Sequence, residues 1–525
     1  MVFSLIMTHT AAKAASPDWT EVSTASQLKA ALADAITTKI ALTADIEVPK
    51  YGITINPDKP SLIINGNPDG NEKHFTLTDY KSSASCHTIS LMKRGRLKEI
   101  TVQNLNVIGY NDHGFIYIKD SSTVKDVTMI YNKVNYTGPQ MLENRYGHVR
   151  IIDCSINIIP VSCCTGEEVA EAINITLEGE VYINKRTPKN CCEVFRVMND
   201  NNKGLGGITV APGANVVVYS NENGAKVISS GFVHFTGCKN YLRFEENSSF
   251  SFRGNNIFAQ CNPVNDVQIK KNALVCIMTT GDLYCAKGQI TVDGQMEVEE
   301  NAVLAMIAEK NTEHQGVLML KGKNTTFTAN SPKQVLIYNS STNQHKEGVA
   351  IECEASGTQT LNFNNINYLG FWYKNTSNNY QSLPEPTKLW TNDDFSCFDA
   401  QIVVNCEKVK SAVSRNYSGT TAFNVNNVAF KYNNVIYMTR TENPVGSIGN
   451  LIINHYIETE YGSNVYEFIS AAPYMPDIGD IITASDYTVD IGEDYIYSHA
   501  SQDELMISEG ENEINLYYNL TDPDE

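Results

Sequence analysis

The sequence predicts an all-β protein whose short strands stack on one another as a solenoid. A unit made of a short alternating apolar run, a turn and a second apolar run recurs at residues 207–219, 267–278 and 288–307. Strands this short cannot bury an apolar face alone, so each unit must stack on copies of itself. Asn and Gly recur at the breaks, as turns with positive φ require. A propeller or a sandwich would also contain many short strands, but the chain carries no blade signature, and a parallel β-helix fits the stacked units better.

Composition supports this fold class and restricts the possible partners. The 525 residues suffice for an elongated domain with smaller ones beside it. Apolar residues make up 42%, which is too many for a disordered tail, and the 27 Tyr and 18 Phe favour strands. The 59 acidic and 40 basic residues give a net charge of −19, which repels phosphate backbones and anionic lipid. We therefore expect no nucleic-acid partner, and no membrane insertion because no apolar run is long enough to span a bilayer.

The first residues indicate export. Residues 2–7 form a short apolar stretch, and Ala12-Lys13-Ala14 resembles a signal-peptide cleavage site. The positively charged start of such a signal is missing, and a disordered tail is the alternative. We interpret residues 1–16 as the remainder of a secretion signal and expect the ordered chain to begin near Asp18-Trp19.

One helix is predicted, close to the N-terminus. Residues 23–26 offer N-cap candidates, and Leu28, Ala31, Leu32 and Ala35 fall on one face at helical spacing. A helix at about residues 26–35, ahead of a stack of strands, is suited to cover the end of an apolar core that would otherwise meet water.

From about residue 51 to residue 374 the chain is a succession of strand patterns with almost no helical periodicity. This region is therefore expected to be the solenoid. Its clearest runs lie at residues 61–66, 100–107, 115–118, 149–152, 173–177, 232–235 and 360–363.

The N-terminal part carries a family resemblance. The order of residues 19–32, 39–46, 62–66 and 74–77, followed by Asn-Tyr-Thr-Gly-Pro-Gln-Met-Leu-Glu-Asn at residues 135–144, resembles the pectate lyase-like adhesive domains of exported Gram-positive surface proteins. The resemblance extends over residues 19–374. It implies a right-handed parallel β-helix over residues 17–375 and a role in adhesion at the bacterial cell surface, without identifying a ligand.

The sequence does not support lyase chemistry. Pectate lyases need acidic residues that hold Ca²⁺ against a uronate and a basic residue that takes the adjacent proton. Their Trp-x-Asp-His and Arg-x-Pro-x-x-Arg motifs are not found; Asp112-His113 is the nearest pair, with Arg145 as a nearby base, and we expect this string to be an isolated turn. The adjacent carboxylates Glu167-Glu168 and Glu299-Glu300 should point to opposite faces of a strand. We predict no catalytic, cofactor-binding or metal-binding residues.

The 13 cysteines are an odd number and do not suggest a metal site. Vicinal pairs lie at Cys163-Cys164 and Cys191-Cys192, and no CxxC spacing typical of zinc is present. Cys154 and Cys276 lie inside strand patterns, where Cys acts as a small buried hydrophobe.

The C-terminal part differs in character. A Pro-containing break at residues 380–387 leads into further β-runs, and we expect residues 376–446 to cap the solenoid or connect it to the C-terminal unit. Residues 447–525 form this unit, which is compact and β-rich with a polar tail, and residues 450–520 resemble the mucin-binding repeats of bacterial adhesins. A generic β spacer is the alternative. We expect this unit to fold independently and to extend binding away from the solenoid.

Together these features predict an exported, non-catalytic surface adhesin. It would be a monomer that binds host or matrix glycans or glycoproteins. Two alternatives remain open, a polysaccharide-active β-helix enzyme with an unrecognised site and a purely structural surface stalk. A cluster of convergent Asp, Glu and basic side chains would favour the enzyme, whereas exposed aromatic side chains would favour binding.

Overall fold

The computed structural model describes residues 18–522 apart from a set of short ranges, so the secretion signal expected at residues 1–16 and the break at 380–387 lie outside the described residues. The ranges left out are 50–51, 69, 71–73, 82–87, 121, 123, 162–167, 187–192, 200–203, 221–230, 255–257, 281–288, 310–315, 341–348, 354–356, 374–387, 392–396, 406–407, 417–418, 423–432 and 440–448.

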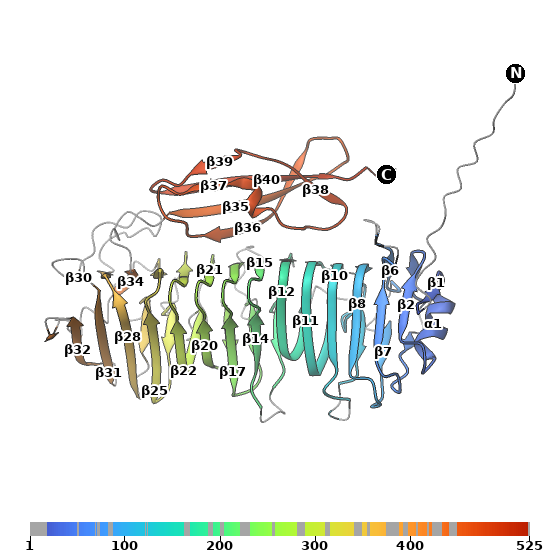
Figure 1. Cartoon of the computed structure of the whole chain (residues 1–525), viewed down its shortest axis with the longest axis horizontal. Coiled ribbons are helices and arrows are strands. Elements are labelled where there is room, and N and C mark those ends of the chain that lie inside the picture. Colours follow the sequence, from blue (N-terminus) through green and yellow to red (C-terminus); the bar gives the residue numbers. More distant parts are fainter. Residues whose placement is uncertain are drawn as a thin grey trace, which may run out of the picture.

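The chain winds into a long parallel β-helix, as predicted (Figure 1). Each coil contributes to three faces, and strand β12 (Ala170–Lys185) shows this most clearly. Its first residues pair in parallel with β13 (Phe195–Val197), its middle with β14 (Gly206–Val210) and its end with β15 (Asn215–Ser220).

The first face, which we call the ladder face, begins with three short strands and continues through the first residues of two long ones. Its strands are β4 (Ile53–Thr54), β7 (Ile89–Leu91), β9 (Ile116–Ile118), the starts of β11 (Leu142–Ile158) and β12, then β13, β16 (Val233–Phe235), β19 (Ala259–Cys261), the start of β22 (Ile290–Val298), β24 (Leu318–Leu320) and β27 (Ile351–Cys353).

The second face begins after a short first strand, β1 (Thr20–Val22), which pairs with β2. Its strands are β2 (Lys39–Leu42), β5 (Leu62–Asn65), the first parts of β8 (Glu99–Ile108) and β10 (Thr128–Gly138), the middles of β11 and β12, β14, β17 (Asn240–Phe244), β20 (Val264–Ile269), the end of β22, β25 (Asn324–Asn330) and β28 (Thr358–Ile366).

The third face, which we call the docking face, completes each coil. Its strands are β3 (Ile46–Glu47), β6 (Thr76–Thr78), the ends of β8, β10, β11 and β12, β15, β18 (Ser249–Gly254), β21 (Leu274–Thr279), β23 (Val303–Ala308) and β26 (Gln334–Asn339).

Turns of one conformation stack where the second and third faces meet. Asn247, Asn272 and Asn301 have φ of 58–59°, and Gly213 occupies the same turn with φ 69°. Each donates its backbone N–H to a carbonyl in the turn of the next coil. The recurrence of Asn and Gly in the sequence therefore marks one repeated corner, because these residues tolerate positive φ best.

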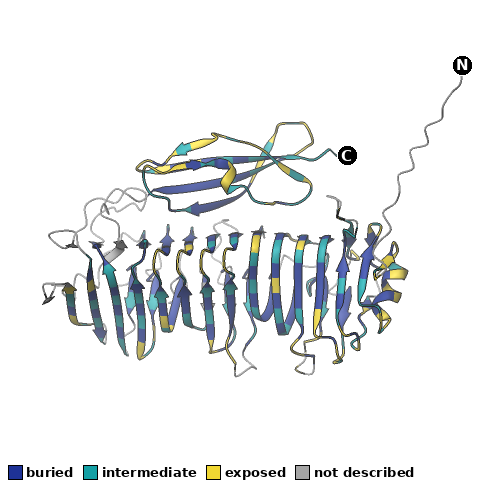
Figure 2. Ribbon diagram, in the orientation of Figure 1, coloured by how far each residue is buried: buried dark blue, intermediate teal, exposed yellow. Residues whose placement is uncertain are grey.

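One apolar core fills the inside of the coils (Figure 2). Alternation directs one side chain inward and the next outward, so short strands such as Phe195–Val197 bury both end residues. Phe232 lies at the centre of an aromatic group, with its ring centroid 4.9 Å from that of Phe258 and 5.4 Å from that of Phe195.

The predicted N-terminal helix is confirmed as α1 (Ala25–Ala33), and it covers the first coil (Figure 1). The Thr24 side chain accepts a hydrogen bond from the Gln27 backbone N–H, and Leu28 and Leu32 are fully buried. The buried Lys59 donates its Nζ to the carbonyl of Ala31 at 3.0 Å, which satisfies a carbonyl at the helix end.

Strand pairing becomes antiparallel at the other end of the solenoid. Here β34 (Asn433–Thr439) pairs with β26 and β31 (Phe398–Asn405) pairs with β28. Strands β29 (Tyr368–Tyr373), β30 (Lys388–Thr391), β32 (Lys408–Asn416) and β33 (Gly419–Ala422) extend this part. The described strands of residues 376–446 thus cover the last parallel edge, which would otherwise expose unpaired backbone groups.

The C-terminal module contains a four-stranded sheet, in the order β36-β35-β40-β38, and a two-stranded one. Its elements are β35 (Asn450–Glu458), β36 (Tyr466–Tyr474), β37 (Ile481–Thr483), the 3₁₀ turn Ala484–Tyr487, β38 (Tyr495–Ala500), β39 (Glu504–Met506) and β40 (Glu511–Leu520).

The expectation that this module extends away from the solenoid is wrong: it lies along the docking face, with β36 beside β15, β18 and β21 (Figure 1). Two apolar clusters join the parts. Ile452, Ala471 and Met475 pack against residues of β21, β23 and β26, and Tyr182 and Val217 enter the module's own core. The expectation failed because the module's own sequence does not show which solenoid residues face it. Outward-facing solenoid residues such as Tyr182 and Val217 bury the apolar surface that the module leaves exposed.

Candidate functional site

Four polar side chains lie in register on the ladder face. Glu143, Glu171, Arg196 and His234 are paired residues of β11, β12, β13 and β16. Their neighbours in sequence on β12, β13 and β16, such as Ala170, Phe195 and Val233, belong to the core, so alternation turns the polar residues outward. We call these four residues the polar ladder. Successive rungs are about 4.8 Å apart, the spacing of neighbouring strands.

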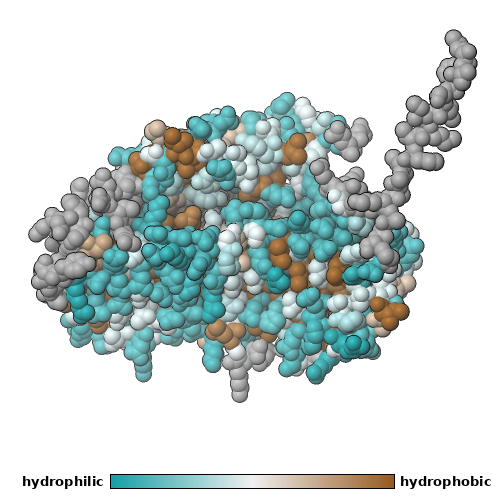
Figure 3. All heavy atoms as spheres, viewed as in Figure 1, coloured by the Kyte–Doolittle hydropathy of each residue, from teal (hydrophilic) through white to brown (hydrophobic). Residues whose placement is uncertain are grey.

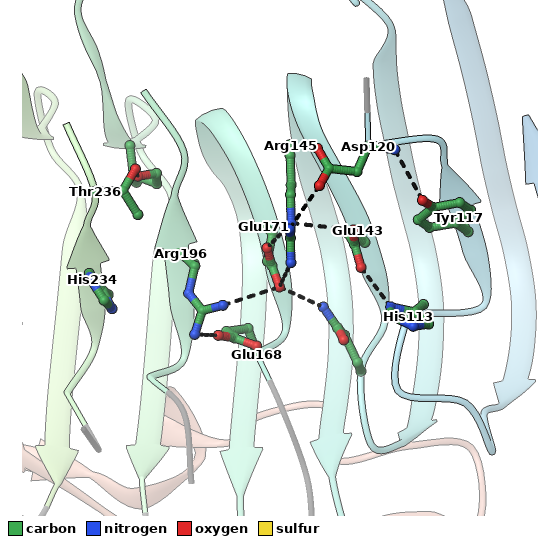
Figure 4. A network of polar contacts seen from close by, with 12 residues as sticks. His113, Tyr117, Asp120, Glu143, Arg145, Glu168, Glu171, Arg196, His234 and Thr236 are labelled. Atoms are coloured by element: carbon green, nitrogen blue, oxygen red, sulfur yellow. Dashed lines mark hydrogen bonds and ion pairs between the residues drawn. The ribbon is translucent and has the colours of Figure 1, made fainter. Parts of the chain in front are cut away.

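Ion pairs connect the ladder into one network (Figure 4). Arg145 donates from Nε to Glu171 at 2.6 Å, lies 3.3 Å from Glu143 and donates from Nη1 to Asp120 at 2.9 Å. Arg196 donates from Nε to Glu193 at 2.8 Å and lies 3.5 Å from Glu171. Figure 4 shows both guanidiniums pointing toward Glu171, which they flank from two sides.

Further contacts close the two ends of the network. Glu168 forms an ion pair with Arg196. His113 Nδ1 lies 2.9 Å from Glu143 at one end, and His234 Nδ1 lies 2.9 Å from Glu193 at the other. Five carboxylates therefore share two arginines and two histidines.

Four of the five carboxylates lie beneath the cations. The side chains of Glu143, Glu168, Glu171 and Glu193 are between 1% and 4% exposed, whereas those of Arg145 and Arg196 are 29% and 24% exposed. His113 and His234 are 36% and 25% exposed. A molecule that approaches this face meets the guanidinium and imidazole groups together with the 38% exposed carboxylate of Asp120, while the four glutamates lie beneath.

Protonation within the network depends on burial and mutual charge. Burial, together with the negative charges of Glu171 and Glu193, raises the pKa of Glu168 to about 8. Burial also pushes the pKa of Glu193 upward, but the hydrogen bond with His234 and the charge of Arg196 outweigh it and leave the pKa below its usual value. The hydrogen bond with Glu143 raises the pKa of His113. Glu193 is therefore ionised at neutral pH, while Glu168 holds its proton to a higher pH than an ordinary glutamate.

Asp112 and His113 lie in a turn, as expected, but the expectation that they are isolated is wrong. His113 contacts Glu143 and thereby joins the network of Arg145, while Asp112 lies 3.9 Å from the Nε2 of His113. Glu168, set aside in the sequence because of its neighbour, pairs with Arg196 instead, and Glu167 lies outside the described residues.

Two groups of residues behave as the sequence suggested. Glu299 and Glu300 stay apart, in separate surface pairs with Lys270 and Lys271 at 2.7 and 2.8 Å, although they lie in the turn after β22 and not, as expected, on a strand. Cys154 and Cys276 are buried free thiols, and burial raises the pKa of each to about 12. The vicinal cysteine pairs lie outside the described residues.

Sequence reasoning missed Glu143, Glu171, Arg196 and His234 as a site. The signal was a charged or polar residue at the centre of an apolar triplet, as in Ala-Glu-Ala at 170–172, Phe-Arg-Val at 195–197 and Val-His-Phe at 233–235. Such triplets mark one outward side chain per coil.

The described residues contain no group of three or more His, Cys, Asp or Glu side chains placed to hold a metal ion. Within the same residues, no helix is long and apolar enough to cross a membrane.

A family model described as "Putative pectate lyase-like adhesive domain" matches residues 19–143, which agrees with the resemblance of the N-terminal segments. The match ends at the first member of the polar ladder. Among solved structures, a chain titled "L. reuteri 53608 SRRP" is 16% identical, with a TM-score of 0.28; the similarity covers 65% of this chain and 98% of that one. No curated protein matches.

Proposed function

We propose that this protein is an exported bacterial surface adhesin that binds glycans on its ladder face. The observation that carries the proposal is the in-register polar ladder, in which buried acids hold Arg145 and Arg196 at the surface. The match of residues 19–143 to an adhesive-domain family supports this function class.

The two arginines are prepared to receive a ligand. Each guanidinium has five N–H donors, and contacts with carboxylates among the described residues engage each of its three nitrogens. A second N–H on each terminal nitrogen remains for hydroxyl or carboxylate oxygens of a sugar. Because the acids fix the guanidinium planes beforehand, a ligand loses little further side-chain entropy.

The geometry suits an extended glycan. A chain that lies across the strands meets a new rung about every 4.8 Å, with His113 and Tyr117 at one end and His234 at the other. On the side shown in Figure 3, which carries the second face and the module, apolar residues lie in separate small patches among hydrophilic ones.

A polysaccharide-active enzyme is the second candidate, because carboxylates and bases converge here as such an enzyme would require. Glu168, with its raised pKa, and the neighbouring Glu171 would be the candidate acid and base. Their burial argues for binding instead: Glu168 is 1% exposed and sits beneath Arg196, whereas a proton donor must reach the bond that it cleaves.

The test uses a glycan and glycoprotein array with the purified chain and with two variants, Arg145→Lys and Arg196→Lys. Lysine keeps the charge above the buried acids but lacks the planar fork, so each variant should weaken glycan binding about tenfold or more. The matched control is Arg243→Lys on the second face, where Arg243 pairs with Asp266 at 3.2 Å; its binding should be unchanged.

Other outcomes would select the alternatives. Release of reducing or unsaturated ends from polyuronates, lost in Glu171→Gln, would establish the enzyme. If no glycan or glycoprotein on the array binds, the remaining interpretation is that the protein is a purely structural surface stalk. The mucin-binding resemblance of residues 450–520 is tested in the same array by retention on mucin.

A further inference from the structure

The last residues of β12 form the main polar contact between the solenoid and the C-terminal module. Tyr182 and Asn184 alternate along the strand and Arg186 follows its last residue, so the three side chains face the module together. Tyr182 donates its hydroxyl to Ser470 at 2.9 Å, and Arg186 donates to the carbonyls of Phe468 and Ile469 at 3.0 and 3.3 Å.

Asn184, which lies between Tyr182 and Arg186, differs from them because its side-chain oxygen makes no hydrogen bond to the described part of the module. It is 5% exposed, and its Oδ1 has no hydrogen-bond partner among the described residues. Buried acceptors are almost always paired, since an unpaired one loses the hydrogen bond that water gave it. The amide therefore points to a donor that comes from outside the chain.

A cavity of about 280 Å³ lies next to this amide, between the solenoid and the module. Thr137, Asn157 and Asn184 are paired residues of β10, β11 and β12 and give it a polar floor. The module supplies mainly isoleucines and one aromatic ring. The full lining is Thr137, Asn157, Ile159, Asn184, Arg186, Ile457, Ile469, Ile491 and Tyr495.

We propose that this cavity binds the terminal N-acetylhexosamine of a glycan. The acetamido N–H supplies the donor that Asn184 Oδ1 lacks, and the acetyl methyl packs against Ile469 and Ile491. Tyr495 offers a ring to the apolar face of the sugar. The volume is slightly below the roughly 300 Å³ at which drug-sized pockets begin, so it suits one sugar ring and not an oligosaccharide.

The site is separate from the polar ladder. The ladder uses the first residues of β11 and β12, whereas the cavity uses their last residues on the docking face. Binding in the cavity thus does not depend on Arg145 or Arg196, and either site can fail in experiment while the other stands.

The test titrates the full chain with methyl N-acetylglucosaminide and methyl N-acetylgalactosaminide, and with the parent methyl 2-deoxyglucoside and 2-deoxygalactoside, which carry no donor at that carbon, by saturation-transfer NMR and calorimetry. At least one acetamido sugar should bind about tenfold or more tightly than its parent, because only it pairs the buried acceptor. Asn184→Leu, which removes that acceptor at similar size, should abolish this preference.

A second variant keeps the test decisive if Asn184→Leu does not fold. Ile159→Trp, at a 37% exposed position of the lining, should block the cavity and remove binding; Ile496→Trp, at a 58% exposed module position outside the lining, should not. Equal affinity for acetamido and parent sugars, binding retained in Ile159→Trp, or a crystal soaked with the acetamido sugar that shows solvent only would overturn the proposal.

Discussion

Replacing Arg196 by Met should destabilise the solenoid, and more so at high pH. The variant keeps an apolar stem of similar length but removes the cation that contacts Glu168, Glu171 and Glu193, all of them 4% exposed or less. Removing one partner of a buried ion pair typically costs about 3–5 kcal/mol. Arg145 and His234 still serve two of the three acids, so we expect about 3 kcal/mol at pH 8.

The pH dependence arises from Glu168. Its pKa is about 8 in the folded protein, above its ordinary value of 4.5, so the folded state holds a proton that the unfolded state has released. The associated stability is fully present below about pH 4.5 and is lost as pH rises through 8. Without Arg196 this loss becomes larger, because no cation then offsets the ionised acid. At pH 5, where Glu168 is protonated in both proteins, the variant should cost about 0.4 kcal/mol less than at pH 8, because the wild-type acid is only half ionised at pH 8.

The assay is urea unfolding followed by far-ultraviolet circular dichroism at pH 5 and pH 8, with hydrogen exchange of β12 and β13 to locate the loss. Arg243→Met is the control, since Arg243 is 40% exposed and such surface pairs contribute about 1 kcal/mol or less. Equal destabilisation by both variants, or a cost of Arg196→Met that is the same at the two pH values, would refute this account of the network.

Three further predictions concern the rest of the chain. Asn272→Val should destabilise the stacked corner by about 1–2 kcal/mol, because Asn272 has φ 59°, while Asn272→Gly should be close to neutral in the same urea assay. In native-state alkylation read by mass spectrometry, the exposed Cys238 should react quickly and the buried Cys276, whose pKa burial raises to about 12, should stay unlabelled; labelling of both at one rate would contradict the packing. Burial lowers the pKa of His455 to about 4, below its ordinary 6.5, so the stability that it contributes is present above pH 6.5 and lost as pH falls toward 4. Exchange protection of the module strands should weaken over that window in wild type and less in His455→Gln, and protection independent of pH would count against this role.

How far the fold could be predicted depended on local pattern. The α1 helix is specified by Leu28 and Leu32 at helical spacing, and the corner of Asn272 by a residue type that tolerates positive φ. These signals lie within one turn or one strand. The stacking of the strands could be predicted because such short runs cannot bury their apolar faces unless they pack on one another.

The candidate site could not be predicted because it exists only through register. Glu171 and Arg196 are tens of residues apart, separated by loops of unequal length, and they become neighbours when coils stack. The docking of the module depends likewise on outward residues such as Tyr182, which look like ordinary solvent-facing strand positions in the sequence. A polar residue at the centre of an apolar triplet predicts that a side chain faces outward, but not which side chain it meets.

The most direct test of the central claim monitors the histidines of the polar network during binding. The chain is labelled at histidine, its ring resonances are assigned with His113→Gln and His234→Gln, and the strongest glycan from the array is added. If glycans bind on the ladder face, the ring signals of His113 and His234 should shift together, while that of the fully buried His455 stays unchanged. Saturating glycan that leaves both ladder-face histidines unmoved would contradict the claim.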